Sequence, residues 1–273
     1  MSILASARPY RIPGYLRPRP ATVLGLAPPA WAAVLGLAAM AAVELASRTG
    51  VVSKFDLVPP SQMAARAAGL LTDTGFLTGQ LVPSIGLIAA TFAIAGGLGV
   101  AAAYLLWRSE WCRKATLPLL GVYYAVPVFA VYPILVVLFG VGTAPILVVS
   151  VAFAVVVVIT NSLTGFDSVP ATVTKLARAR RLTARQYLTK VLLPAAVPDV
   201  VAGLRLGLVY STIGVLATEF ILSTKGLGHF IADAYHTFRV DDMYAGILLI
   251  CVVALILNVT VAAMLGRIDW RRR

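Results

Sequence analysis

Charged residues, cysteines and histidines are scarce in this sequence, and each shortage excludes a class of protein. Only 12% of the 273 residues are charged and 60% are hydrophobic, whereas a soluble domain carries about 25% charged residues. The two cysteines, Cys112 and Cys251, and the two histidines form neither a disulfide framework nor the usual spacing of a zinc site. With a mean hydropathy of +0.90, the sequence indicates a membrane protein.

Acidic residues are the scarcest charged residues, with 11 against 23 basic ones and a net charge of +12. A basic surface that binds nucleic acid lies on a soluble scaffold, which this composition does not support. Lysine and arginine also gather in the loops on one side of a membrane. We therefore expect the lipid bilayer, and no nucleic acid, to be the partner of these cations.

The glycine-rich ATP-binding motif G-x-x-x-x-G-K-[ST] does not occur in the sequence, so ATP binding by that route is not expected. His229 and His236 have aspartates nearby but no convincing set of metal ligands, and nothing in the sequence brings a serine, a histidine and an aspartate together. We expect this chain to hold no metal and no cofactor, to have no catalytic residues and not to be an enzyme.

Long apolar runs of about 17–25 residues are typical of membrane-spanning helices. The run at 115–166 has no charged residue and is too long for one helix, but GVGTAP at Gly140–Pro145 divides it, because glycine and proline mark a tight turn. We predict an all-α, polytopic membrane fold: a basic segment at 1–29, then a transmembrane domain at 30–273. Its six or so spans lie at residues 31–47, 81–106, 117–139, 146–163, 195–222 and 244–266.

The positions of lysine and arginine predict the orientation of these spans. The cations concentrate before the first span, after the second and fourth spans, and after the sixth. Short loops rich in lysine and arginine face the cytoplasm, so we predict that both termini are cytoplasmic. The first apolar run is too long, and its flank too basic, for a cleaved signal peptide, so we expect it to be a retained span.

The predicted loop at 166–194 contains an unusual stretch, KLARARRLTARQYLTKVLLP (Lys175–Pro194), with cations and no acid. Its apolar residues recur at spacings near three and four, which predicts an amphipathic helix. Two interpretations follow. The helix lies on anionic lipid at the membrane surface, or it is a docking surface for a partner protein.

The residues around this stretch resemble the permeases of ABC importers. KVLLPAAVPDVVAGLRLGL (190–208) is similar to the end of their cytoplasmic EAA signature, with matches at Ala177, Val191, Leu193 and Pro194. The resemblance continues, in the same order along the chain, to the nitrate/sulfonate/taurine branch of these permeases. It is carried by LVPPSQ (57–62), VPVFAVYPILVVLFGVG (126–142), GLRLGLVYSTIGVLATEFILSTKGLGHFIADAYHTF (203–238) and MYAGILLI (243–250).

Two positions depart from the family's signature, which has a glutamate where this chain has Lys175 and a glycine where it has Arg181. The family's glycine lies in a tight turn between two short helices. Such a turn favours a positive φ, where residues other than glycine are uncommon. The departures raise the question whether the turn is still formed.

The resemblance implies a type I ABC importer permease-like fold in the inner membrane of a bacterial cell, with a short cytoplasmic coupling helix near Thr174–Leu182. It implies a separate dimer of ABC ATPase subunits, which binds ATP and magnesium, and a periplasmic or lipid-anchored solute-binding protein. A second permease, either another copy or a paralogue, would complete the path for a small anion such as a sulfonate, taurine or nitrate. The residues implied to couple to the ATPase are Lys175, Leu176, Ala177, Arg178, Arg181, Leu182 and Thr183.

Polar residues inside spans are candidates for the translocation path, because a charge there costs about 2.5–3.5 kcal/mol on insertion scales. Glu219 is either a path residue or a structural hydrogen-bond partner, and Arg205 either lines the path or extends to the cytoplasmic surface. Asn161 is a path residue or an interhelical contact, and Tyr124 is a path residue or part of the core.

Two other functions are left open by the sequence. A proton-coupled secondary transporter would use Glu219, Arg205 and Asp199, but such transporters contain inverted repeats, and none is evident here. A membrane-embedded enzyme has no candidate catalytic set. The favoured function is the permease subunit of an ATP-driven importer.

Overall fold

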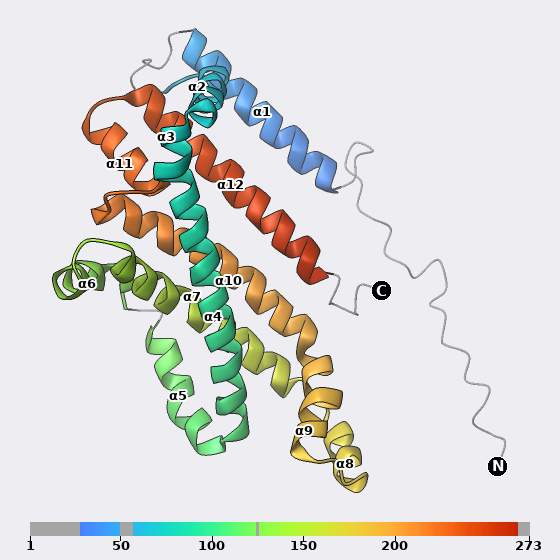
Figure 1. The fold of residues 1–273 in the computed structure, drawn as a ribbon. Coiled ribbons are helices and arrows are strands. Elements are labelled where there is room, and N and C mark those ends of the chain that lie inside the picture. Colours follow the sequence, from blue (N-terminus) through green and yellow to red (C-terminus); the bar gives the residue numbers. More distant parts are fainter. Residues whose placement is uncertain (1–27, 50–56, 124–125, 267–273) are drawn as a thin grey trace, which may run out of the picture. The chain divides into compact units, whose positions relative to one another are not determined.

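The computed structural model describes residues 28–49, 57–123 and 126–266 (Figure 1). Every regular element in these ranges is a helix, as predicted. The chain divides into two units, residues 1–61 and 62–273. Nearly all of the predicted basic segment, 1–29, lies outside the described residues.

The first unit contains α1 (Pro28–Arg48), which includes the first predicted span. Near the end of α1, the carboxylate of Glu44 accepts three hydrogen bonds. The donors are the backbone N–H of Ser61 (3.0 Å), the Oγ of Ser61 (2.7 Å) and the Nε of Arg48 (2.6 Å). Ser61 is the second residue of α2 (Pro60–Thr72). The first N–H groups of a helix have no partner within that helix. Glu44 therefore supplies a partner for one such group at the start of α2, the N–H of Ser61.

The second and fifth predicted spans are longer than expected. A continuous helix runs over Thr74–Arg108, through α3 (Thr74–Phe76), a π-helical turn (Leu77–Leu81) and α4 (Val82–Arg108). Another runs over Ala184–Ile221, through α9 (Ala184–Tyr187), a π-helical turn (Leu188–Leu192) and most of α10 (Leu193–Leu222).

Each π-helical turn is followed by an α-helix whose second residue is a proline, Pro83 in α4 and Pro194 in α10. Within a regular helix the proline ring clashes with the carbonyl four residues earlier. A single wider turn removes this clash without ending the helix. The helix therefore continues through the proline into the span.

The third predicted span, 117–139, is wrong as a single helix. The structure instead has α5 (Glu110–Tyr123), a 3₁₀ turn (Val128–Val131) and α6 (Tyr132–Phe139), and the two parts are bent by 85° relative to each other. Pro127, at the start of the 3₁₀ turn, and Pro133, in the first turn of α6, lie at this break. Proline is tolerated in the first turn of a helix and not in its middle, so the two prolines favour a break in the span at this point.

The predicted turn at Gly140–Pro145 is confirmed. Gly140, with a φ of 78°, follows the end of α6, and α7 (Thr143–Asp167) begins within the predicted range, so that Pro145 lies in its first turn. Glycine adopts a positive φ without a steric penalty. The fourth and sixth predicted spans lie within α7 and α12 (Val240–Gly266), whereas the short helices α2 and α11 (Leu227–His236) were not predicted.

Within the described ranges, four helices are long and apolar enough to cross a membrane, and the bent α5–α6 pair makes five if it is one span. They are Thr74–Arg108, Thr143–Asp167, Ala184–Ile221 and Val240–Gly266. The total of six spans stays a prediction.

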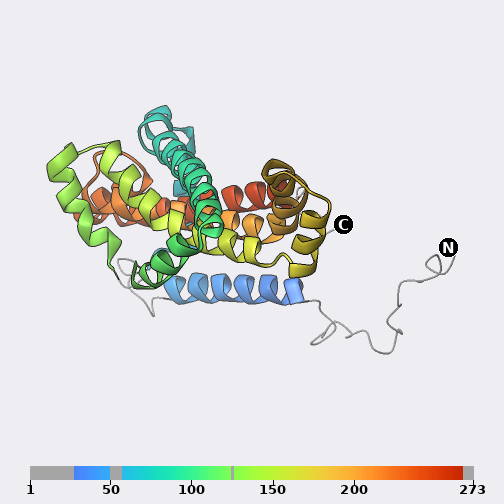
Figure 2. The same ribbon diagram turned by 90° about the horizontal axis from the view of Figure 1, so that it is seen from below.

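Three helices, α4, α7 and α10, form the centre of the second unit (Figures 1 and 2). Glycine allows them to approach closely. A Cβ on Gly203 of α10 would lie 2.7 Å from Asn161 Cβ of α7, and a Cβ on Gly99 of α4 would lie 2.7 Å from Val158 Cβ. Small residues at helix contacts are typical of membrane proteins, where dispersion between closely packed backbones drives association.

This centre has two distinct ends. At one end, α8 (Ala171–Ala179) precedes α9, whose Tyr187 packs against a cluster that includes Phe166, Leu192 and Ala196. At the other end, α11 and the start of α12 pack with Phe76 and α2 in a separate cluster. Both views place these two ends at opposite extremes of α10 (Figures 1 and 2).

Candidate functional site

The stretch with many cations forms a separate short helix, α8 (Ala171–Ala179). The helix predicted near Thr174–Leu182 exists, but it begins and ends three residues earlier. It starts directly after Pro170, which cannot donate a backbone hydrogen bond and suits the position before a first turn. It ends where the chain reverses toward α9.

The turn after α8 is a Schellman motif, the standard C-terminal cap of a helix. The N–H of Leu182 donates to the carbonyl of Ala177 (3.1 Å), and the N–H of Arg181 donates to that of Arg178 (2.9 Å). Arg181 has a φ of 50°, at the position where such caps usually carry glycine. The turn implied by the resemblance is therefore formed, with an arginine in the left-handed conformation.

A second cap begins α9 directly after this turn. The hydroxyl of Thr183 accepts from the N–H of Gln186 (3.3 Å), and the side chain of Gln186 accepts from the N–H of Thr183 (3.0 Å). This reciprocal capping box satisfies two otherwise unpaired N–H groups. Thr183, predicted as a coupling residue, therefore holds the α8–α9 corner in shape.

The predicted coupling residues differ in how much solvent they meet. Ala177 is buried and Leu182 is half-buried, whereas Leu176 is 59% exposed and its neighbour Val173 is 39% exposed. The remaining members of the set are exposed: Lys175, Arg178, Arg181 and Thr183. The accessible apolar residues of α8 are thus Leu176 and Val173, and Leu182 belongs mainly to the turn.

A hydrogen bond and an aromatic stack connect α8, through Tyr187 of α9, to α4. The hydroxyl groups of Thr174 on α8 and Tyr187 on α9 are 3.0 Å apart and hydrogen-bonded. The ring of Tyr187 stacks on Trp107 near the end of α4, with centroids 6.2 Å apart and an interplanar angle of 13°. Trp107 also contacts Phe166 of α7 (6.3 Å). We call Thr174, Tyr187 and Trp107 the aromatic bracket; it joins α8 to a membrane helix.

A cleft of about 340 Å³ lies beside this bracket. Its lining combines aromatic and charged residues, among them Trp107, Phe166, Tyr187, Lys175 and Arg178. Asp167 also lines it, and both of its carboxylate oxygens are bound by Arg113 of α5, at 2.8 and 2.7 Å. The charge of Asp167 is therefore already paired.

Glu219, the predicted path residue in α10, is 2% exposed and fully engaged. Both of its carboxylate oxygens lie within 2.8 Å of Ser84 Oγ on α4, and the N–H of Gly228 donates to one of them at 3.0 Å. Gly228 is in the first turn of α11, where a negative charge is favourable. These contacts support the structural interpretation of Glu219, and its role in a path stays a prediction.

Sequence reasoning missed four residues that surround Glu219. Ser84 also accepts from the N–H of Leu227 (2.7 Å), and Gln80 accepts from the N–H of Gly226 (2.9 Å). A Cβ on Gly226 would lie 2.3 Å from the carboxyl carbon of Glu219, and one on Gly228 would lie 2.4 Å from the carbonyl of Leu216. The sequence signal was available: two glycines in KGLG follow the acid, and Gln80 and Ser84 are polar residues one helical turn apart.

Two other predicted path residues, Arg205 and Asn161, do not hydrogen-bond to Glu219. Arg205 donates to the carbonyl of Ala262 near the end of α12 (3.1 Å), where a cation is favourable. Asn161 donates to the carbonyl of Val157 in its own helix (2.8 Å), and Tyr124 lies outside the described residues. Within the described ranges, no group of three or more histidine, cysteine, aspartate or glutamate side chains could hold a metal ion.

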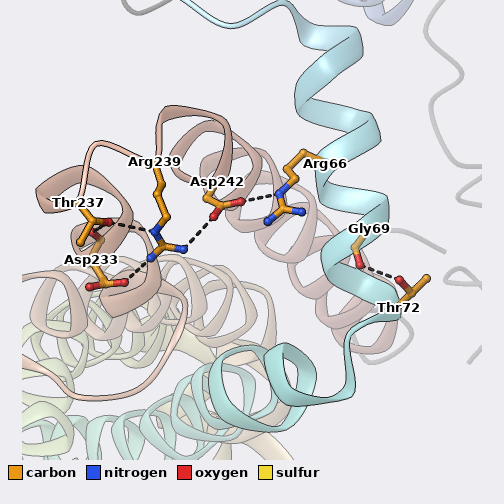
Figure 3. Close-up of polar contacts among 7 residues, drawn as sticks. All are labelled: Arg66, Gly69, Thr72, Asp233, Thr237, Arg239 and Asp242. Atoms are coloured by element: carbon orange, nitrogen blue, oxygen red, sulfur yellow. Dashed lines mark hydrogen bonds and ion pairs between the residues drawn. The ribbon is translucent and has the colours of Figure 1, made fainter.

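A network of ion pairs lies at the α11 end (Figure 3). Asp242 of α12 accepts from Arg66 of α2 (2.5 Å) and from Arg239 (2.8 Å), and Arg239 also binds Asp233 of α11. The hydrogen bond and the charge of Asp242 raise the pKa of Arg66 above its ordinary value. The network ties α2, α11 and α12 together at this end.

Comparison with known proteins gives consistent matches. The model of the family described as binding-protein-dependent transport system inner membrane component matches residues 68–273. The probable ABC transporter permease protein of Haemophilus influenzae is 33% identical over 172 residues, 63% of this chain and 70% of that protein. The putative aliphatic sulfonates transport permease protein SsuC of Bacillus subtilis is 30% identical over 204 residues, 75% of this chain and 74% of that protein.

The taurine transport system permease protein TauC of Escherichia coli is 28% identical over 223 residues, 80% of this chain and 81% of that protein. Among solved structures, a chain of the MetNI methionine ABC transporter in an inward-facing conformation matches with a TM-score of 0.62 at 16% identity. The match covers 72% of this chain and 99% of that chain, and it shows that the fold is shared. Because the family model covers well over half of the sequence, the chain belongs to the family of binding-protein-dependent transport system inner membrane components and is a multi-pass membrane protein.

Proposed function

We propose that this chain forms the translocation path of an ATP-driven importer, that a separate ATPase subunit docks on α8, and that an extracytoplasmic binding protein delivers the solute. The main support for docking at α8 is the distribution of apolar and charged residues on the surface of this helix. The helix has exposed Leu176 at its surface, flanked by exposed cations, and the aromatic bracket connects it to a membrane helix. Such a helix can transmit movement of a partner to the spans.

The solute is inferred from the names of similar proteins. Relatives are described as permeases for aliphatic sulfonates, taurine and nitrate, which are small and carry an anionic group. We propose that this chain transports a solute of that class, and that a second permease, identical or paralogous, completes the path. The ATP and its magnesium ion would be bound by the ATPase subunits.

The membership of the family favours this function over a proton-coupled secondary transporter. The residues which that alternative would use are also engaged in helix contacts. Glu219 binds Ser84 and Gly228, and Arg205 binds the carbonyl of Ala262. Both side chains have a structural partner that a proton path does not require.

Docking on α8 is tested by the amount of ATPase that co-purifies with the chain. Truncating or charging the apolar centre of an interface costs more than changing its rim, so Leu176→Asp is expected to abolish retention of the ATPase. Leu176→Met keeps the apolar side chain and should retain it. Leu182→Asp is expected to lower the amount of folded protein as well, because Leu182 is half-buried in the turn. Normal retention in Leu176→Asp would exclude α8 as the docking site.

The orientation is proposed from the charge distribution, with both termini and α8 in the cytoplasm. Ser168 caps the end of α7 next to α8, and Asp233 lies in α11 at the opposite extreme of α10. A reporter fused after Ser168 should be cytoplasmic, and one fused after Asp233 should be external. Reporters on the same side would contradict the proposed topology.

A further inference from the structure

Cations without an anionic partner cover the surface at the α8 end. Six cations of the stretch at 175–194 are exposed, and within the described residues none forms an ion pair: Lys175, Arg178, Arg180, Arg181, Arg185 and Lys190. Five other described cations do form ion pairs: Arg48, Arg66, Arg113, Lys114 and Arg239. Arg108 and Lys225 are also exposed and form no ion pair within the described chain, but the unpaired cations are most concentrated along α8 and α9.

Neither α8 nor α9 contains an acidic residue. No aspartate or glutamate occurs between Asp167 and Asp199. Asp167 lines the same cleft as Lys175 and Arg178, but Arg113 binds both of its oxygens. Like charges three or four residues apart on a helix repel each other, and this repulsion is not relieved within the described part of the chain.

Arg181 adds an independent observation. It lies at a φ of 50°, where glycine is favoured and a side chain is disfavoured. Its side chain is exposed and makes no hydrogen bond with any other described residue. An arginine at a position that disfavours it, with no partner in the described chain, indicates that its charge acts on something outside the chain.

A lipid surface fits α8 poorly. A helix that lies in the membrane interface presents a broad face of large apolar residues. Only Val173 and Leu176 are exposed large apolar residues on α8, which has 9 residues. The cations therefore surround a small apolar centre, which is the arrangement of a protein interface with a polar rim.

We propose that the surface which receives α8 is acidic, with carboxylates of the ATPase subunit opposite Lys175, Arg178 and Arg181. This inference rests on the proposed function, since it assumes that an ATPase docks on α8. Complementary charges across an interface steer association and select the correct partner. The glutamate that the family's signature has in place of Lys175 would require a partner of the opposite sign, so this chain should select its own ATPase over one matched to the glutamate.

The test is a charge reversal at one exposed residue. The chain is co-expressed with the ABC ATPase subunit of its own transporter, extracted in a neutral detergent and captured by a tag, and the retained ATPase is measured at low and high salt. Lys175→Glu is expected to lower retention at least tenfold at low salt, and Lys175→Ala severalfold. Lys225→Glu is the matched control, because Lys225 is exposed on the turn before α11, at the opposite extreme of α10.

The outcomes separate this inference from the proposed function. Lower retention in Lys175→Glu, and retention in the unchanged chain that weakens at high salt, would support an acidic receiving surface. Equal or stronger retention in Lys175→Glu would overturn the inference while leaving docking on α8 in place. If Leu176→Asp and Lys175→Glu both retain the ATPase fully, then α8 is not the docking site and the proposed function also fails. The yield of monodisperse protein confirms that each variant is folded.

Discussion

Ser84 of α4 and Glu219 of α10 form a hydrogen bond of 2.7 Å, although 135 residues separate them in the sequence. Ser84 donates its only hydroxyl proton to the carboxylate and accepts the N–H of Leu227 at the start of α11 (2.7 Å). All of these groups are buried. One serine therefore fixes three helices relative to each other at a point that water does not reach.

We predict that Ser84→Ala destabilises the folded protein by about 1–3 kcal/mol, because it leaves the buried N–H of Leu227 without a partner and removes one of the two hydrogen-bond donors to the Glu219 carboxylate. Glu219→Ala should be similarly harmful, whereas Glu219→Gln keeps an acceptor for the N–H of Gly228 and should be milder. Thermal unfolding in detergent measures these effects. Ser223→Ala is the matched control, since the hydroxyl of Ser223 bonds only to the adjacent exposed turn. If Glu219→Gln folds normally but loses uptake, Glu219 also belongs to the path.

Contact between α7 and α10 gives a second prediction. A Cβ on Gly203 would lie 2.7 Å from Asn161 Cβ, while one on Gly86 of α4 would have no neighbour within 4 Å. Gly203→Ala should cost about 1–3 kcal/mol, because two packed helices must separate. Gly86→Ala should be neutral or gain up to about 1 kcal/mol, because alanine favours the helix. Equal thermal stability of the two variants would show that α7 and α10 do not pack as closely as the structure has them.

Local patterns in the sequence were sufficient for much of this fold. Apolar runs predicted five of the six proposed spans as helices, and glycine and proline predicted the turn at Gly140. Two features depended on information that no local pattern contains. The third span is broken near Pro127 and Pro133, and the size of this bend depends on how α6 packs against α7. The partners of Glu219 come from α4 and α11, and a single sequence does not show which distant polar residues meet.

The aromatic bracket gives a third prediction, on the transmission of movement. Tyr187→Phe removes the hydrogen bond to Thr174 but keeps the ring stacked on Trp107, while Trp107→Leu removes the stacking. Both changes lie behind the exposed face of α8, so the ATPase should still be retained. We expect Trp107→Leu to lower the number of solute molecules transported per ATP hydrolysed severalfold, and Tyr187→Phe to lower it less. A normal ratio in Trp107→Leu would show that α8 transmits movement by another route.

The conformation of Arg181 gives the sharpest comparison, because its neighbour is also an arginine. A left-handed conformation costs an L-residue about 1–2 kcal/mol, and glycine avoids this cost but loses about 0.5–1 kcal/mol through its greater freedom in the unfolded chain. Arg181 has a φ of 50°, so Arg181→Gly should stabilise the protein by up to about 1.5 kcal/mol. Arg180 has a φ of −78°, so Arg180→Gly should instead lose about 0.5–1 kcal/mol.

The two substitutions remove the same charge from adjacent exposed positions, so a general effect of charge would move both melting temperatures in the same direction. If the two melting temperatures move in opposite directions, the backbone conformation of the substituted residue, and not the lost charge, causes the difference. If the charge of Arg181 meets carboxylates of the ATPase, Arg181→Gly should also retain less ATPase while it melts at a higher temperature. That combination would show that Arg181 destabilises the α8–α9 turn and stabilises the interface with the ATPase. A rise in melting temperature without any loss of ATPase would leave the arginine at this turn unexplained.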